Sequence, residues 1–133
     1  MRLSRGQSLL ELAICLPIVL SLGLGSAAVV QVAAASTGLK AATEAAASAA
    51  ARAPDAATAV VYAQARFASV ISDYPIRSAT LELPAANFSR GTIVTLNATG
   101  FADVGWGSVA FTPARVQLRA QATFRVEPWR TRR

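Results

Sequence analysis

The chain has 133 residues, of which 53% are hydrophobic and 15% charged, and its 13 basic and 7 acidic side chains give a net charge of +6. It has no histidine and one cysteine, so it offers no Ser/His or Cys/His nucleophile pair, no zinc cluster and no internal disulfide. We therefore expect neither an enzyme nor a protein that needs a cofactor or metal. The length fits one membrane anchor followed by one small domain.

The N-terminal part of the chain is apolar over a long distance, with no charged side chain between Glu11 and Lys40. A helix crosses the hydrocarbon core of a bilayer with about 20 residues at about 1.5 Å rise per residue. We therefore predict a transmembrane segment at about residues 12–35. Arg2 and Arg5 precede it, and basic residues favour the cytoplasmic side of a membrane. The N-terminus is thus expected in the cytoplasm, and the rest of the chain beyond the membrane.

A distinct pattern stands at the head of this apolar run. Gly6 ends a short basic leader, and Glu11, five residues later, is the lone carboxylate of the run. The stretch 6–13, with the sequence GQSLLELA, and the following Leu16-Pro17 resemble the processing site of type IV prepilins and pseudopilins. Within that group they are most similar to the TadE-like minor pilins of the tight-adherence (Tad/Flp) pilus system.

This resemblance implies a processing site, a location and a set of partners. A prepilin peptidase would remove the leader, residues 1–6, by cutting after Gly6, which makes Gln7 the new N-terminus. The chain would be held in the bacterial inner membrane and would enter or prime a surface pilus that serves attachment. Its partners would be other pilins, through the N-terminal helix, and the platform protein and secretion ATPase of that system.

The carboxylate of Glu11 has a chemical reason to be present if the chain assembles in this way. It can neutralise the N-terminal amine of an adjacent subunit, because an unpaired charge among packed apolar helices would be costly. Three other interpretations use the same region. Ser8 and Glu11 form a capping box that suits the start of any helix; residues 32–35 could end a cleavable secretory signal; and Cys15 could be a lipoprotein site, although it suits a buried membrane residue better.

Small residues are spaced along the apolar run in a way that favours close helix packing. Ser21 and Gly25 stand four residues apart, as do Gly23 and Ala27, and such spacing lets neighbouring membrane helices approach each other. Ordinary glycine content of a membrane helix would give the same pattern. Pro17 removes one backbone donor and is expected to kink the helix, which membrane helices tolerate.

The apolar run continues into an alanine-rich segment, since roughly half of residues 27–53 are alanine, the strongest helix former. We predict one N-terminal helix over residues 7–53, which stops before Pro54 because the residue preceding a proline disfavours the α conformation. A smooth alanine surface suits either the packing of many helices side by side or a plain spacer.

A second helix is predicted within residues 54–75. Asp55 can cap its start, and Tyr74-Pro75 would close it. Its apolar stripe, at helical spacing, is expected to be a packing surface rather than a ligand site; the stripe consists of Val60, Ala63, Phe67, Val70 and Ile71.

Residues 76–133 change to a period of two, which is typical of strands. Alternation is visible around Leu81 and Leu83, at 94–98 and most clearly at 115–127, with a weaker candidate at 104–111. We therefore predict an α+β protein of pilin-like form, with an antiparallel sheet of three or four strands. The sheet is too small to stand alone, so the second helix is expected to cover its apolar face.

The polar face of the last strand carries a row of arginines at positions 115, 119 and 125, with more at 130, 132 and 133. No nucleic-acid motif accompanies this row, and a charged row is usually a solvated face, so nucleic-acid binding is not expected. Two hypotheses of different kinds follow from the sequence. One is a minor pilin-like subunit, and the other is a single-pass membrane-anchored binding module that never assembles. Cleavage after Gly6 discriminates between them, since a permanent anchor has no use for it.

Overall fold

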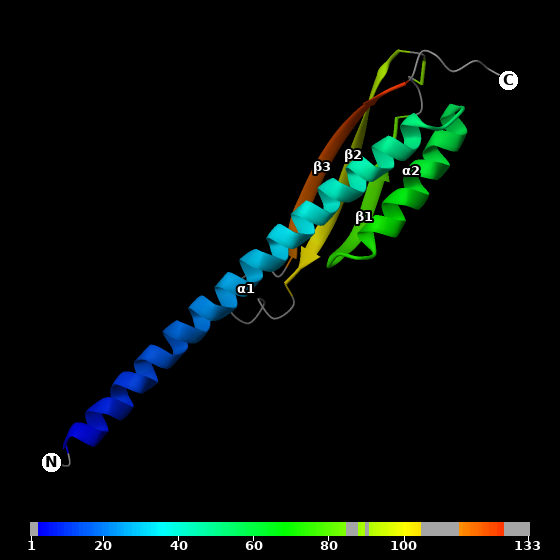
Figure 1. Cartoon of the computed structure of the whole chain (residues 1–133). Helices are drawn as coiled ribbons and strands as arrows, with labels where there is room; N and C mark the ends of the chain where they lie inside the picture. The colour runs from blue at the N-terminus through cyan, green and yellow to red at the C-terminus, as the bar shows by residue number, and fades with distance from the viewer. Residues whose placement is uncertain (1–2, 85–87, 90, 105–114, 127–133) are drawn as a thin grey trace.

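The structure is a computed structural model that describes residues 3–84, 88–89, 91–104 and 115–126. These residues form an α+β fold with two helices and a three-stranded antiparallel sheet of order β1-β2-β3 (Figure 1). The elements are α1 (Leu3–Ala51), α2 (Ala56–Ile71), β1 (Ile76–Glu82), β2 (Ile93–Asp103) and β3 (Arg115–Arg125). The coarse prediction, an α+β class with a long N-terminal helix, a second helix and an antiparallel sheet, is thus confirmed. The weak strand candidate at 104–111 lies, from residue 105 on, outside the described residues, as do Glu127 and the C-terminal arginines.

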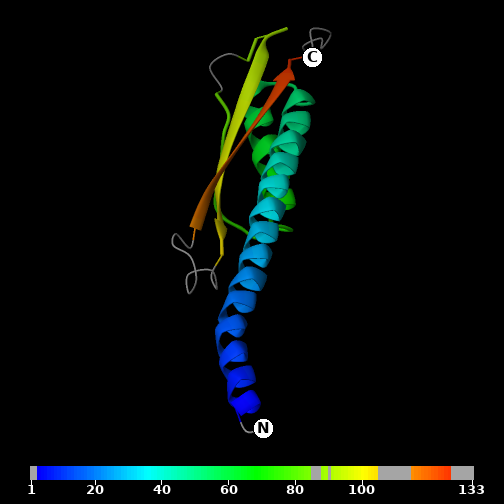
Figure 2. The same ribbon diagram turned by 90° about the vertical axis from the view of Figure 1, so that its left-hand side faces the viewer.

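The first helix is longer at its start than the predicted range 7–53. It begins at Leu3 and runs through Pro17 without a break. Its end at Ala51 agrees closely with the prediction, and the chain tightens there into i to i+3 hydrogen bonds, with the Ala53 N–H donating to the Ala50 carbonyl at 3.1 Å. The helix continues on both sides of Pro17, so both halves of α1 belong to one helix, which curves in its N-terminal half (Figure 2).

The two halves of α1 lie in different surroundings. From Gly6 to Leu24 every side chain is exposed, whereas Ala35, Leu39 and Ala42 are completely buried. The buried residues of the second half recur every three or four positions, as one face of a helix requires. The polar residue within this face, Thr43, is satisfied because its Oγ1 donates to the Leu39 carbonyl at 2.6 Å. The folded domain therefore begins in the middle of α1.

The apolar face of the sheet is covered chiefly by α1, so the expectation that the second helix covers it was wrong. The C-terminal half of α1 packs across β2 and β3, while α2 packs against α1 and meets the sheet chiefly at the edge strand β1. The physical reason is the alanine surface of α1, which lets the sheet approach the helix axis closely. The inward residues of the two longer strands complete this core; they are Val94, Leu96, Ala98, Ala102, Leu118, Ala120, Ala122 and Phe124.

The start of α2 follows the prediction. Asp55 has an extended backbone, and its side chain accepts a hydrogen bond of 2.7 Å from the Thr58 N–H. That hydrogen bond is the main cause of a lowered pKa for the Asp55 carboxyl, since it favours the charged form. Of the predicted stripe, Ala63 and Phe67 are buried, whereas its other members are half-buried. Ala59, which is not part of the predicted stripe, is completely buried. Its small side chain suits close packing of α2 against the alanine face of α1.

The sheet alternates cleanly between a buried and a wet face. Along β3 the even-numbered residues from 118 to 124 are buried and the odd-numbered residues are exposed, as the sequence period predicts. β1 is less regular, because its pairing with β2 shifts between Arg77 and Thr80 and Ser78 has a φ of 52°. Beside this bulge the Arg77 Nε lies 3.2 Å from Asp103 Oδ2, in an exposed ion pair.

One glycine of α1 is required by a close contact. A Cβ at Gly38 would overlap the ring of Tyr74, which follows α2 and lies against the helix there, whereas a Cβ at Gly23 would meet nothing within 4 Å. The missing side chain at position 38 thus sets the distance between α1 and the turn after α2.

We predict that Gly38→Ala destabilises the folded domain. Overpacking of this kind costs about 1 to 3 kcal/mol, which exceeds the gain of about 0.5 to 1 kcal/mol from replacing a helical glycine. Chemical unfolding of the detergent-solubilised chain, followed by the near-ultraviolet circular dichroism of its tyrosines, measures the change. Gly23→Ala is the matched control and should leave the free energy of unfolding equal or raised. Equal stability of the two variants would contradict the assigned contact.

Candidate functional site

The processing-type pattern lies in the first turns of α1. Gly6, Gln7 and Glu11 are all exposed and all helical, so the expected cleavage position lies within helical backbone. Because α1 already begins at Leu3, Ser8 stands at the sixth position of the helix and cannot be its N-cap in the uncut chain. The capping box therefore does not explain Glu11 in the uncut chain, and it stays a prediction for a chain that begins at Gln7.

Glu11 is surrounded on its own helix by large apolar side chains that are open to the outside. Leu9, Leu10, Leu12 and Ile14 are 68%, 64%, 60% and 59% exposed. Among the side chains that the structure describes, which begin in α1 at Gly6, the one ion pair joins Arg77 to Asp103, so none of these side chains neutralises the Glu11 carboxylate. The site thus holds one negative charge in an apolar surface.

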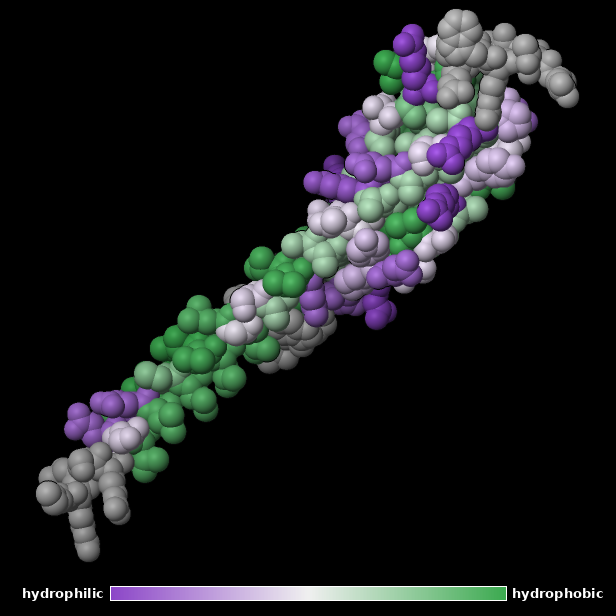
Figure 3. Space-filling view, viewed as in Figure 1, coloured by the Kyte–Doolittle hydropathy of each residue, from purple (hydrophilic) through white to green (hydrophobic). Residues whose placement is uncertain are grey.

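The exposed apolar surface extends far beyond this carboxylate. Figure 3 shows it as a green zone over the N-terminal half of α1, between a few purple side chains near the start of the helix and the largely polar folded domain. The large exposed side chains beyond Ile14 include Leu16, Ile18, Val19, Leu20, Leu22, Leu24, Val29 and Val30. Burying one such side chain is worth about 1.5 to 3 kcal/mol, so a surface of this size calls for a cover of lipid or protein. By length and composition α1 can cross a membrane.

The residues predicted for helix packing lie on this same surface. Ser21, Gly23 and Ala27 are exposed and Gly25 is half-buried. Ser21 Oγ donates to the Pro17 carbonyl at 2.7 Å, so its hydroxyl is satisfied within the helix and does not need a partner. The structure thus leaves Ser21, Gly23 and Ala27 available to another helix.

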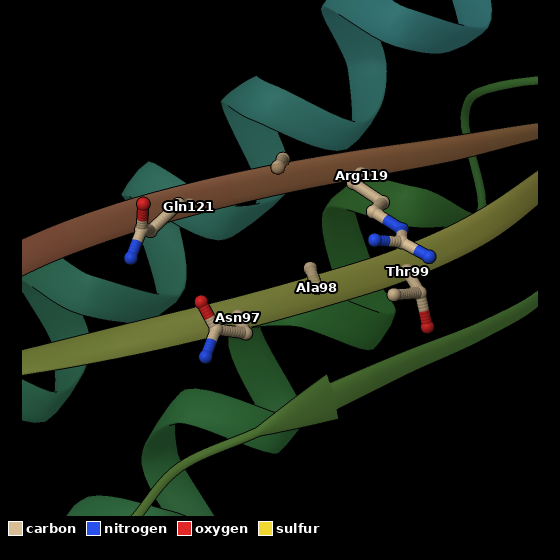
Figure 4. A pocket seen from close by; sticks show the side chains of 6 residues that line it. Asn97, Ala98, Thr99, Arg119 and Gln121 are labelled. Atoms are coloured by element: carbon tan, nitrogen blue, oxygen red, sulfur yellow. The ribbon is translucent and has the colours of Figure 1, made fainter.

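The outer face of the sheet is a second polar surface, which the sequence indicated only through its arginines. The side chains of Asn97, Thr99, Arg119 and Gln121 point away from the helices and line a shallow hollow of about 380 Å³ (Figure 4). The register places Asn97 opposite Gln121 and Thr99 opposite Arg119. The alternation of the strands could have identified all four residues, because each occupies a wet position. No group of three or more His, Cys, Asp or Glu side chains within the described residues could hold a metal ion.

The fold and these surfaces define the class of protein as an α+β domain with a long apolar N-terminal helix, suited to a membrane span or a signal anchor. Comparison with family models, with curated proteins and with solved structures finds no match.

Proposed function

We propose that the protein is a minor pilin-like subunit of a Tad/Flp type IV pilus system, processed after Gly6 by a prepilin peptidase. In this proposal α1 holds the chain in the bacterial inner membrane, with the N-terminus in the cytoplasm and the α+β domain outside. After processing the subunit would take part in pilus assembly for surface attachment. Its partners would be other pilins along α1, together with the platform protein and secretion ATPase of the system.

The observation that carries this proposal is Glu11 on the exposed apolar half of α1. A charge costs about 2.5 to 3.5 kcal/mol at the centre of a membrane helix and less near the interface. A helix that served only as an anchor would be better without that cost. Cleavage after Gly6 would create a positive amine at Gln7, and the carboxylate of one subunit can neutralise the amine of its neighbour. The helix surface with Ser21, Gly23 and Ala27 supports the same proposal, because it lets the two helices come close.

A single-pass membrane-anchored binding module is the second candidate. The polar hollow on the outer face of the sheet favours it, since a recognition surface there needs no assembly along α1. This candidate gives no role to Gly6, Gln7 or Glu11. Processing and the charge of Glu11 therefore separate the two candidates.

We predict that the chain isolated from membranes of its own host begins at Gln7. Intact-mass analysis or N-terminal sequencing of the extracted protein measures this directly. Gly6→Val should leave the leader attached, because a branched side chain replaces a hydrogen atom at the cleavage position. Gly23→Val, at another exposed glycine of the same helix, should be cut normally. A chain that begins at Met1 would favour the anchored module, and a start near Ala28 or Ser36 would point to an ordinary secreted protein.

We further predict that Glu11→Gln blocks assembly while insertion and cleavage continue. Glutamine has nearly the shape of glutamate and lacks only the charge that would neutralise a neighbour's amine. Co-purification of partner pilins with the tagged variant, after crosslinking in membranes, should fall at least about tenfold, which corresponds to roughly 1.4 kcal/mol. Glu44→Gln is the matched control, since Glu44 is an exposed carboxylate on the part of α1 that belongs to the folded domain. Wild-type recovery of partners with Glu11→Gln would remove the charge argument.

A further inference from the structure

The two outer edges of the sheet differ in regularity. The edge strand β1 is interrupted by the bulge between Arg77 and Thr80, and α2 packs beside it. β3 pairs with β2 in an unbroken register over all of its eleven residues, Arg115–Arg125, and it contains neither proline nor a bulge. Within the described residues no strand pairs with the other side of β3. Proteins usually protect such long regular edges, because the unpaired backbone groups attract another strand.

The backbone hydrogen bonds of Val126, the residue after β3, indicate which backbone groups of β3 face outward. Val126 faces the residues that lead into β2. Its N–H donates to the Thr92 carbonyl at 3.1 Å, and its carbonyl accepts from the Gly91 N–H at 3.0 Å. In an antiparallel pair successive residues point their N–H and C=O groups to opposite sides. The even-numbered residues of β3 therefore bond to β2. The odd-numbered residues, Arg119 and Gln121 among them, direct their N–H and C=O groups toward the open edge.

The side chains of the same odd-numbered residues lie on the outer face of the sheet. They are Arg115, Gln117, Arg119, Gln121, Thr123 and Arg125, so β3 brings three positive charges and no negative charge to this border. A strand laid along the edge would place every second side chain directly beside them, within reach of cross-strand contact. Carboxylate and amide side chains would complement guanidinium and amide groups.

The spacing of the arginines suits an extended chain better than a compact anion. Arg119 is four residues from Arg115 and six from Arg125, which correspond to about 13 and 20 Å along a strand. Three charges in such a line cannot converge on one small anion. On one face of a second strand, however, a side chain recurs at every second residue, so a side chain can lie beside each of the three arginines. A second copy of this protein is disfavoured as the occupant, because its own β3 would bring the same three positive charges to the border.

We propose that the open edge of β3 accepts an extended segment of another protein, one that carries carboxylates at alternate positions. The segment pairs through its backbone with the odd-numbered residues of β3, and its acidic side chains lie beside Arg115, Arg119 and Arg125. This proposal does not rest on processing after Gly6, and it applies equally to the uncut chain.

The test uses the full chain in detergent micelles and a fluorescent ten-residue peptide that alternates threonine and glutamate. Fluorescence anisotropy measures the binding, and a peptide that alternates threonine and lysine is the control for charge. Binding of the acidic peptide with at least about tenfold preference, weakened by salt, is the expected result. Arg119→Gln should weaken it several-fold. Failure of the acidic peptide to bind at millimolar concentration would overturn the proposal.

Two measurements separate strand pairing from attraction by charge alone. Hydrogen exchange of the backbone amides should slow at Arg119, Gln121 and Thr123 when the peptide binds. Gln121→Pro removes one outward N–H at an edge position where proline is tolerated, and it should weaken binding at least about tenfold, whereas Gln121→Ala should not. If the proline variant unfolds, hydrogen exchange in the wild-type protein still distinguishes strand pairing from attraction by charge alone.

An acidic polysaccharide is the competing occupant of this face. Polygalacturonate is the probe for it, because it carries carboxylates but forms no strand. If polygalacturonate binds as well as the peptide, and neither ligand slows exchange at Arg119, Gln121 and Thr123, the face recognises acidic polymers and the strand proposal is overturned.

Discussion

The contact between the alanine face of α1 and the elements packed on it is the constraint on which the rest of the structure depends. Ala42, Ala46 and Ala50 are completely buried, although each contributes only a methyl group. Such small side chains gain little from the hydrophobic effect individually, but they let the sheet and α2 lie close to the helix axis. The alanine face of α1 thereby forms one side of the hydrophobic core. A three-stranded sheet of this size could not form a stable core without such a helix.

This arrangement also explains why one helix can serve two environments. The second half of α1 is held on one side by the sheet and on another by α2, so the first half projects from the folded domain as a continuation of the same rod (Figure 1). The carboxylate of Glu11 and the open edge of β3 therefore belong to separate surfaces, one on the projecting helix and the other on the domain. A partner that packs along α1 leaves the outer face of the sheet uncovered.

Much of the fold could be predicted from local patterns, because those patterns act through neighbouring residues. The alternation along β3, the cap at Asp55 and the end of α1 near Pro54 are of this kind. The helix that covers the sheet was not predicted. Lys40, Glu44 and Ser48 do mark an exposed side of α1, but both helices have an apolar side, and local patterns do not say which of the two meets the sheet. The bulge at Ser78 depends on tertiary contacts as well, and so does the space that Gly38 leaves for Tyr74.

In the candidate site, too, some features follow from local sequence patterns and others depend on tertiary contacts. The exposed surroundings of Glu11 and the small residues of α1 follow from composition and spacing. The capping box does not apply to the uncut chain, because the helix begins five residues before Ser8. The polar hollow needed the register of β2 and β3, which brings Asn97 next to Gln121 and Thr99 next to Arg119. No pattern within a single strand contains that pairing.

By length and composition α1 can cross a membrane, and we propose that its first half lies in lipid while its second half belongs to a domain in water. Spin labels at Leu22→Cys and Ser48→Cys, both made with Cys15→Ser and reconstituted into bilayers, test it most directly, because both positions are exposed. We predict that dissolved oxygen relaxes the label at position 22 more strongly than a water-soluble nickel chelate does, and that the order reverses at position 48. Equal access of the nickel chelate to both labels would contradict it.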